Sequence, residues 1–342
     1  MSDLKVNVER NKAKSERFTI NEDSKLKEIM SKFGSLLGLV LLCVLLTIVS
    51  RDFLTFNNVM KIANQASITC LISMGMLVTI LTAGIDLSVG SVLAFSTCFM
   101  GIAVIKWDIN PIIAILLCLI TGSFLGYLNG IMLTKLKLPH PFISTMAMKN
   151  IARGLALVIT VASPVSGFPK SVQFLGAGSI GPVPVSFILV IICAIILYIF
   201  LNRTSQGRHI YAVGGNKEAA KLSGINVNRT LVMVYVICGF MAALAGVVLT
   251  GRVNAAFPLA GLEYETDAIA ACIIGGTSFW GGVGTVGGTL IGAFIMTVLK
   301  NGLNLLSVSS DLQTVAIGLV IIGAVYVDVM RSAAAKKAKV VA

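Results

Sequence analysis

Charged side chains gather in one long polar stretch, residues 202–229, which reads NRTSQGRHIYAVGGNKEAAKLSGINVNR. Its basic residues are Arg203, Arg208, Lys217, Lys221 and Arg229. Connections between helices usually need only about 2–8 residues, so this stretch is much longer than a turn requires. We therefore expect it to form a surface on which a partner protein docks.

Side chains for catalysis or metal binding form no recognisable pattern. The sequence contains no G-x-x-x-x-G-K-[ST] phosphate loop and no nucleophile placed beside a base. His140 and His209 have no cysteine, aspartate or second histidine at ligand spacing, and every cysteine lies in an apolar run. We expect no metal site, no cofactor bound by this chain and no ATP hydrolysis of its own, which argues against a membrane enzyme.

Ionisable residues also occur in or beside apolar runs, where they are costly and call for an explanation. Asp86, Asp267 and Asp311 each stand just before such a run, which favours helix N-capping. Lys149 and Arg153 are four residues apart and so share one helical face. Two interpretations of this pair stay open. Either it lines a polar cavity, or its helix begins later and both side chains snorkel to the membrane surface.

The composition predicts an all-α, polytopic membrane protein. The chain is 56% hydrophobic and only 12% charged, with a mean hydropathy of +0.92, whereas soluble domains average roughly 25% charged residues. A net charge of +12 does not indicate nucleic-acid binding here. Most Lys and Arg residues lie in four separate segments, namely 1–33, 135–137, 202–229 and 331–339, which is the asymmetry that orients membrane proteins.

About ten transmembrane helices are predicted, because a span needs ~20 apolar residues. The candidate spans are 34–50, 62–82, 87–105, 111–134, 142–162, 185–201, 231–250, 268–280, 287–306 and 312–330. Ten spans put both termini on one side, and placing that side in the cytoplasm puts all four basic segments inside. The predicted organisation is a cytoplasmic arm (1–33), a transmembrane domain (34–330) containing the cytoplasmic loop 202–229, and a cytoplasmic tail (331–342).

Two of these spans have weak boundaries. The span at 268–280 is short, and the break at Ala83–Asp86 is very tight. Glycines surround both places, from Gly84 to Gly90 and from Gly275 to Gly288. Broken or re-entrant helices are one interpretation, because irregular backbone survives at membrane depth where protein or water satisfies it. Close helix packing alone is the other.

Five stretches of the chain carry a resemblance to a known family: ILTAGIDLSVGSVLA (80–94), PFISTMAM (141–148), GRHIYAVGGNKEAAKLSGINVN (207–228), YETDAIAACIIGGTS (264–278) and NGLNLLSVSS (301–310). Together they resemble the permease subunits of ribose-type monosaccharide ABC importers. These segments spread over nearly the whole chain. Two departures are visible: no Ile-x-Leu-Pro follows Gly224, as is usual for the sugar branch, and Lys149-Asn150 stands where more apolar residues are expected.

The resemblance implies a permease in the bacterial cytoplasmic (inner) membrane that works as a homodimer or close heterodimer. It also implies a separate cytoplasmic ATPase, which hydrolyses the ATP, and an external sugar-binding protein, periplasmic or lipid-anchored. A short helix at Lys217–Ser223 would dock on the ATPase, with turns permitted by the glycines at each end. The residues implied in this coupling loop are Arg208, Gly214, Gly215, Asn216, Glu218, Ala219, Ala220 and Gly224.

Small polar side chains near the second span suggest where a sugar passes. They are Asn64, Gln65, Ser67, Thr69 and Ser73, followed by Asp86 and Ser88 at the break. Amides and hydroxyls suit neutral sugar hydroxyls, and broken helices free backbone groups for the same purpose. The alternative is that these side chains only hold helices together by hydrogen bonds.

The competing function is a secondary transporter or channel for a small polar solute, which would need no ATPase. The long central loop and the lack of a chain of buried acids or histidines for ion coupling disfavour it. The identity of the sugar is barely encoded, because the resemblance places most of the affinity in the external binding protein.

Overall fold

The computed structural model describes residues 34–136 and 138–341. The predicted arm 1–33 lies outside the described residues. The helices are Gly34–Val49, α2 (Phe56–Leu81), α3 (Val89–Ile105), α4 (Pro111–Lys135), α5 (Pro141–Thr160), α6 (Lys170–Ala177), α7 (Val185–Arg203), α8 (Ser205–Gly215), α9 (Lys217–Leu222), α10 (Val227–Val253), α11 (Tyr264–Ile274), α12 (Val286–Leu305) and α13 (Ser310–Val341). The described strands, β1 (Val165–Ser166), β2 (Ser179–Ile180), β3 (Val183–Pro184) and β4 (Ala255–Ala256), have two residues each and only fasten loops.

Seven described helices are long and apolar enough to cross a membrane, namely α2, α4, α5, α7, α10, α12 and the Ser310–Met330 part of α13. Every predicted span overlaps a helix, although the predicted span 268–280 runs past the end of α11 into irregular chain. However, Gly34–Val49, α3 and α11 fall short of a full span's length. With 11 residues, α11 is only about 16 Å long, half of the hydrocarbon thickness. The all-helical membrane class is thus confirmed, while ten crossings remain a prediction.

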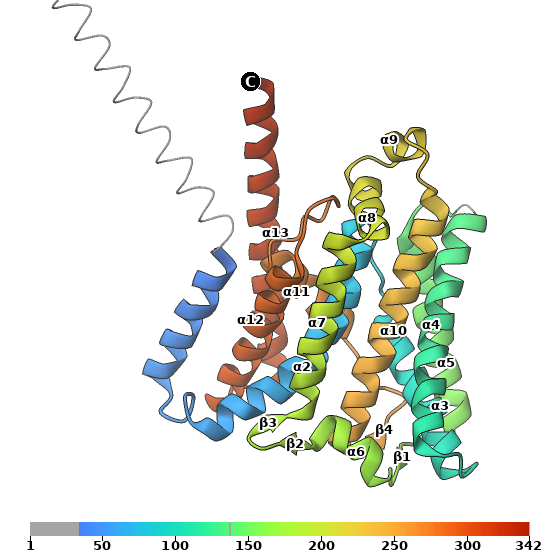
Figure 1. The fold of residues 1–342 in the computed structure, drawn as a ribbon. Coiled ribbons are helices and arrows are strands. Elements are labelled where there is room, and N and C mark those ends of the chain that lie inside the picture. Colours follow the sequence, from blue (N-terminus) through green and yellow to red (C-terminus); the bar gives the residue numbers. More distant parts are fainter. Residues whose placement is uncertain (1–33, 137, 342) are drawn as a thin grey trace, which may run out of the picture.

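The helices form a bundle with α2 and α10 at its centre (Figure 1). In the most apolar 18-residue stretch of α2, 83% of the residues are buried, and in that of α10 the share is 72%. In the corresponding stretches of α4 and α5 only 28% are buried. A helix that is apolar on all sides is suited to such a central position. The outer helices instead expose large side chains such as Ile120 and Phe124 of α4. Lipid would cover these faces in a bilayer.

Glycines bring α4 and α10 into backbone contact. A Cβ atom added at Gly126 would lie 2.1 Å from the Tyr235 carbonyl oxygen, and one at Gly239 would lie 2.2 Å from that of Gly122. Neither distance can accommodate a side chain. This is the small-residue packing that replaces hydrophobic attraction between membrane helices, and it positions α10 directly beneath the central loop.

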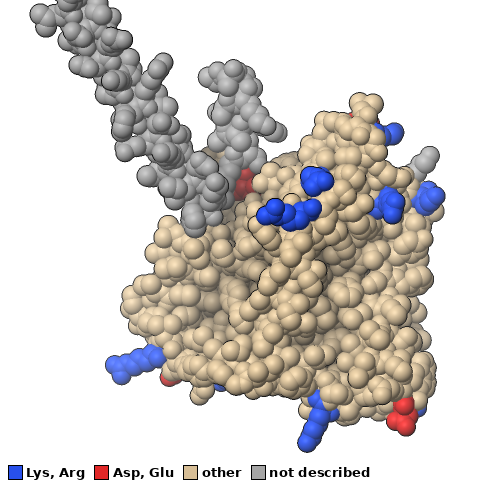
Figure 2. Space-filling model, viewed as in Figure 1, with Lys and Arg blue, Asp and Glu red and all other residues tan. Residues whose placement is uncertain are grey.

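The two ends of the bundle differ in structure. At one end stand α8 and α9, and at the other lie α6 and the strands (Figure 1). There β1 pairs antiparallel with β4, which joins the chain after α5 to the chain after α10. Figure 2 shows Lys and Arg at both ends and an uncharged belt between them on the visible face. Such a belt matches the hydrocarbon layer of a membrane.

The chain is interrupted at both predicted places. After α2 the segment 82–88 is irregular, and Ala83 has a left-handed backbone (φ 57°). After α11 the segment 275–285 follows, with positive φ at Gly276, Gly281 and Gly282. The helix α13 continues to Val341, so most of the predicted tail is a helical extension of the last apolar segment.

Candidate coupling and translocation site

The central loop folds into two helices, and α9 is closed at both ends by local hydrogen bonds. At its start the Asn216 side-chain oxygen accepts from the Ala219 backbone N–H at 2.9 Å. At its end Gly224 adopts φ 81°, the Ile225 N–H donates to the Ala220 carbonyl and the Gly224 N–H donates to that of Lys221. This is the Schellman pattern. The predicted short helix with Gly224 closing it is confirmed.

The helix α9 has one anchored side and one free side. Ala220 is buried and packs with Val213, Val227 and Leu231, which fixes α9 on α8 and α10. Glu218 and Ala219 are exposed, and the side chain of Leu222 is 89% exposed. Leu222 was not predicted from the sequence. The sequence signal for Leu222 was an apolar residue between two polar neighbours in an otherwise polar stretch.

The end of α8 touches both helix breaks. A Cβ atom at Gly214 would lie 1.7 Å from the Leu81 carbonyl oxygen and 2.7 Å from the Gly282 nitrogen. The Gly282 N–H donates to the same Leu81 oxygen at 2.9 Å. Gly214 therefore occupies a junction where the central loop, the end of α2 and the loop 275–285 meet.

The predicted turn at Gly214-Gly215 is wrong, because α8 continues through Gly215 and the chain turns at Asn216. Gly214 is small to permit close packing rather than a turn. A further tie comes from Tyr211 of α8, whose hydroxyl donates to the Gly284 carbonyl at 2.9 Å. Burial raises the pKa of the Tyr211 phenol, which keeps it protonated as a hydrogen-bond donor. Arg208 is exposed, and His209 is half-buried.

At the break between α2 and α3, Asp86 is buried, with 1% exposure. It does not cap α3 as predicted, because Ser88 holds the N-cap position. Instead, Asp86 Oδ1 accepts from the Ser88 N–H at 2.8 Å and from its hydroxyl at 2.5 Å. Asn129 of α4 then donates to the Ser88 hydroxyl at 2.9 Å. These bonds fix the start of α3 against α4.

The predicted path residues separate into two groups. Asn64 and Gln65 line an open pocket of about 650 Å³ with Asn57, Lys61 and Arg252, at the end opposite α9. Asn64 also donates to the Gly176 carbonyl at 2.8 Å and to the Ser186 hydroxyl at 3.1 Å, which fits the helix-holding alternative.

The remaining path candidates do not line this pocket. The Ser67 hydroxyl bonds to the carbonyl of its own helix at Ala63. Thr69 is half-buried and Ser73 is fully buried. The structure thus brings Asn64 and Gln65 together at a cavity, and leaves Ser67 and Ser73 inside the packed bundle.

Two ion pairs hold the start of α11, and the sequence did not predict them. Glu265 pairs with Lys149 of α5, and Asp267 pairs with Lys300 of α12, each at 2.5 Å. Both acids are buried while both lysines remain partly exposed. Asp267 is therefore not an N-cap, since it lies inside the helix that begins at Tyr264. Asp311 likewise lies inside the first turn of α13.

Arg153 and Lys149 follow neither predicted alternative fully. Arg153 donates to the backbone carbonyls of Pro258 and Ala260, which lie in the segment leading into α11. Lys149 bonds to Glu265 in α11 itself, so the two cations tie α5 to that helix and to the segment before it. The available signal was complementary charge: acids near the start of one apolar segment, and lysines inside others. Among the described residues no group of His, Cys, Asp and Glu has the arrangement of a metal site.

Residues 58–325 match the family model described as branched-chain amino acid transport system / permease component. The chain belongs to this permease family. It is 44% identical to the ribose import permease protein of Bacillus subtilis, covering 89% of this chain and 95% of that protein. It is also 44% identical to the D-allose transport system permease protein of Escherichia coli (87% and 91% covered).

A third relative is the galactose/methyl galactoside import permease protein of Haemophilus influenzae, at 35% identity over 87% of this chain and 94% of that protein. No solved structure matches this chain significantly. As a multi-pass membrane permease of this family, the protein is a transport subunit of an ABC importer rather than an enzyme.

Proposed function

We propose that this permease carries a monosaccharide, ribose in the first instance, across the bacterial cytoplasmic membrane and couples that transport to a separate ATPase. Relatives named for ribose, allose and galactose support a sugar substrate. The observation that carries the coupling part is the junction at Gly214, where the central loop contacts both helix breaks.

The coupling surface is the free side of α9, formed by Glu218, Ala219 and Leu222. A partner that grips this side and moves would displace α9 together with α8, because Ala220 holds α9 in the cluster with Val213. From α8 the motion would pass to the end of α2 and to the loop 275–285 through the contacts at Gly214. A nucleotide-driven ATPase supplies a two-state bias of this kind.

The sugar path would begin at the open pocket beside Asn64 and Gln65. Both are amides, which match neutral hydroxyls without the strong binding of a fixed charge, and weak contacts favour release. Asp86 and Ser88 would act at the break, where they hold α3 and α4 in register. The dimer axis would bring two such paths together.

The partners in this proposal are a second permease copy or a close relative, a cytoplasmic ATPase and an external sugar-binding protein. Both termini and the α8–α9 end would face the cytoplasm. Arg203, Arg208, Lys217, Lys221 and Arg229, all in or beside α8 and α9, support this orientation.

The test is reconstitution of the chain in proteoliposomes with its ATPase and the sugar-binding protein. Uptake of radiolabelled ribose should require ATP and all three proteins. Dissipating the ion gradient across the membrane should leave the rate of uptake unchanged. Uptake without the ATPase would favour the competing secondary transporter or channel. If another pentose or hexose is taken up and ribose is not, the coupling proposal stands and only the proposed substrate changes.

A further inference from the structure

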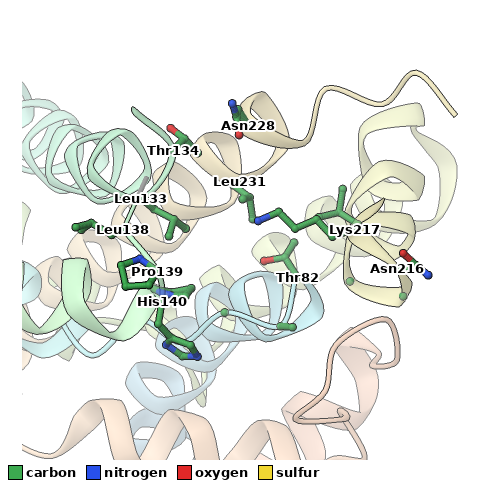
Figure 3. A pocket seen from close by; sticks show the side chains of 16 residues that line it. Thr82, Leu133, Thr134, Leu138, Pro139, His140, Asn216, Lys217, Asn228 and Leu231 are labelled. Carbon is green, nitrogen blue, oxygen red and sulfur yellow. The ribbon is translucent and has the colours of Figure 1, made fainter. Parts of the chain in front are cut away.

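A second cavity lies beside the central loop. Its volume is about 510 Å³, within the range of small-molecule sites. Its walls come from the break after α2, the end of α4 with the linker to α5, the end of α8, the start of α9 and the start of α10. Figure 3 shows the side chains that line it.

The lining of this cavity mixes polar and apolar side chains and includes one lysine, Lys217. The Lys217 side chain extends from α9 across the cavity toward Thr82 and Leu231 (Figure 3). Among the described residues, no acidic side chain lines the cavity and no carboxylate lies within 4.0 Å of the Lys217 ammonium. Within the part of the chain that the structure describes, Lys217 is thus a cation directed into a cavity without a carboxylate beside it.

His140, in the linker between α4 and α5, also lines the cavity, and its imidazole ring points away from Lys217 (Figure 3). Its Nδ1 accepts a hydrogen bond from the Phe142 N–H at 3.1 Å, where it caps α5. In the neutral ring the proton then resides on Nε2, which is left as a donor. Thr82, Thr134 and Asn228 contribute further polar groups to the lining.

We propose that this cavity binds a phosphate group, carried by a soluble phosphorylated sugar or by an anionic lipid headgroup. Lysine binds phosphate as a point charge, and a doubly charged phosphate gains more from the Lys217 ammonium than a single carboxylate would. The cavity has room for a phosphorylated pentose.

An occupant would contact the break after α2 and the α8–α9 joint at the same time, because both line the cavity. It would restrain the motion of α9 relative to α2 and so slow transport. This regulatory consequence rests on the proposed coupling function, whereas the binding itself does not.

The test measures binding without ATPase or uptake. The purified permease is placed in phosphatidylcholine nanodiscs and titrated with ribose 5-phosphate by isothermal titration calorimetry, with ribose as the unphosphorylated control. We expect binding of the phosphate ester and at least tenfold weaker binding by Lys217→Gln. Lys221→Gln is the matched control, because Lys221 is on the same helix but does not line the cavity.

A second arm separates the two sources of phosphate. Phosphatidylglycerol is added to the nanodiscs, and bound lipid is counted by native mass spectrometry. Lipid retained by the wild type and lost in Lys217→Gln, with displacement of the sugar phosphate, would assign the cavity to lipid. The melting temperatures of both variants should equal that of the wild type, which shows that they are folded. If neither the sugar phosphate nor the lipid then binds in a way that depends on Lys217, the proposal is wrong. Because no transport is measured, this result leaves the proposed function untouched.

Discussion

Single glycines in this protein have distinct roles that depend on what surrounds them. Gly214 is surrounded by backbone atoms of α2 and of the loop 275–285, whereas its neighbour Gly215 has nothing within 4 Å of an added Cβ. Gly224 is needed for its left-handed backbone, since φ is 81° there. The three residues look alike in the sequence, but a methyl group would have a different consequence at each.

Replacement of Gly214 by alanine should reduce sugar uptake about tenfold or more. The new Cβ would overlap the Leu81 carbonyl oxygen and force α8 away from both breaks, and forced overpacking typically costs about 1–3 kcal/mol. Uptake in reconstituted proteoliposomes measures the effect. Gly215→Ala is the control and should transport normally, so equal loss in both variants would contradict the role given to the junction.

At the opposite mouth, Gln65 gives a cleaner test of the sugar path than Asn64. Asn64 bonds to Gly176 and Ser186, so its loss would disturb packing as well. Gln65 is exposed, lines the 650 Å³ pocket and makes no side-chain hydrogen bond to another described residue. Gln65→Leu should lower uptake several-fold while melting temperature and ATPase binding stay unchanged. Normal uptake would place the path elsewhere.

At the scale of elements, α11 depends on its neighbours more than on its own length. It spans only 11 residues and begins at two buried acids, each neutralised by a lysine from another helix. Removing one partner leaves a buried carboxylate uncompensated, which costs more than the ion pair itself contributes. The pairs therefore fix where α11 sits between α5 and α12.

Lys300→Ala should lower the melting temperature of the detergent-solubilised protein by several degrees, because Asp267 stays buried and unpaired. The double variant Lys300→Ala with Asp267→Ala should recover part of that loss. Lys106→Ala, at an exposed position, is the control for loss of a surface cation. A single variant that melts like wild type would mean that water already compensates Asp267.

At the scale of the whole molecule, orientation can be tested by chemical labelling. In a cysteine-free background, Ser179→Cys should react with an impermeant thiol reagent added outside cells, and Asn216→Cys should not. Ser179 is exposed in β2 at the end opposite α9. The neighbouring Gly178 is a poor choice, because a Cβ there would lie 2.4 Å from the Phe174 carbonyl. External labelling at position 216 would reverse the proposed topology.

The helical architecture, the central loop and the sites of both breaks could be predicted, because long apolar runs and clustered glycines are local signals. Contacts between distant segments could not. Nothing near Lys149 in the sequence indicates Glu265, and nothing near Gly214 indicates Leu81 and Gly282. The capping role assigned to Asp267 failed for the same reason, since its cation stands on α12.

The helix α2 lies at the centre of the bundle and is synthesised well before the helices that pack around it. Its main neighbours, α7, α10, α11 and α12, all follow it in the chain. At roughly 5–20 residues per second, the ribosome needs about 7–30 s to move from the end of α2 to the start of α10. Throughout that interval Ser67 and Ser73 would have no packed bundle around them. The permease should therefore be most vulnerable to membrane proteases before α10 is made, and truncations that end ahead of Val227 should be degraded rapidly.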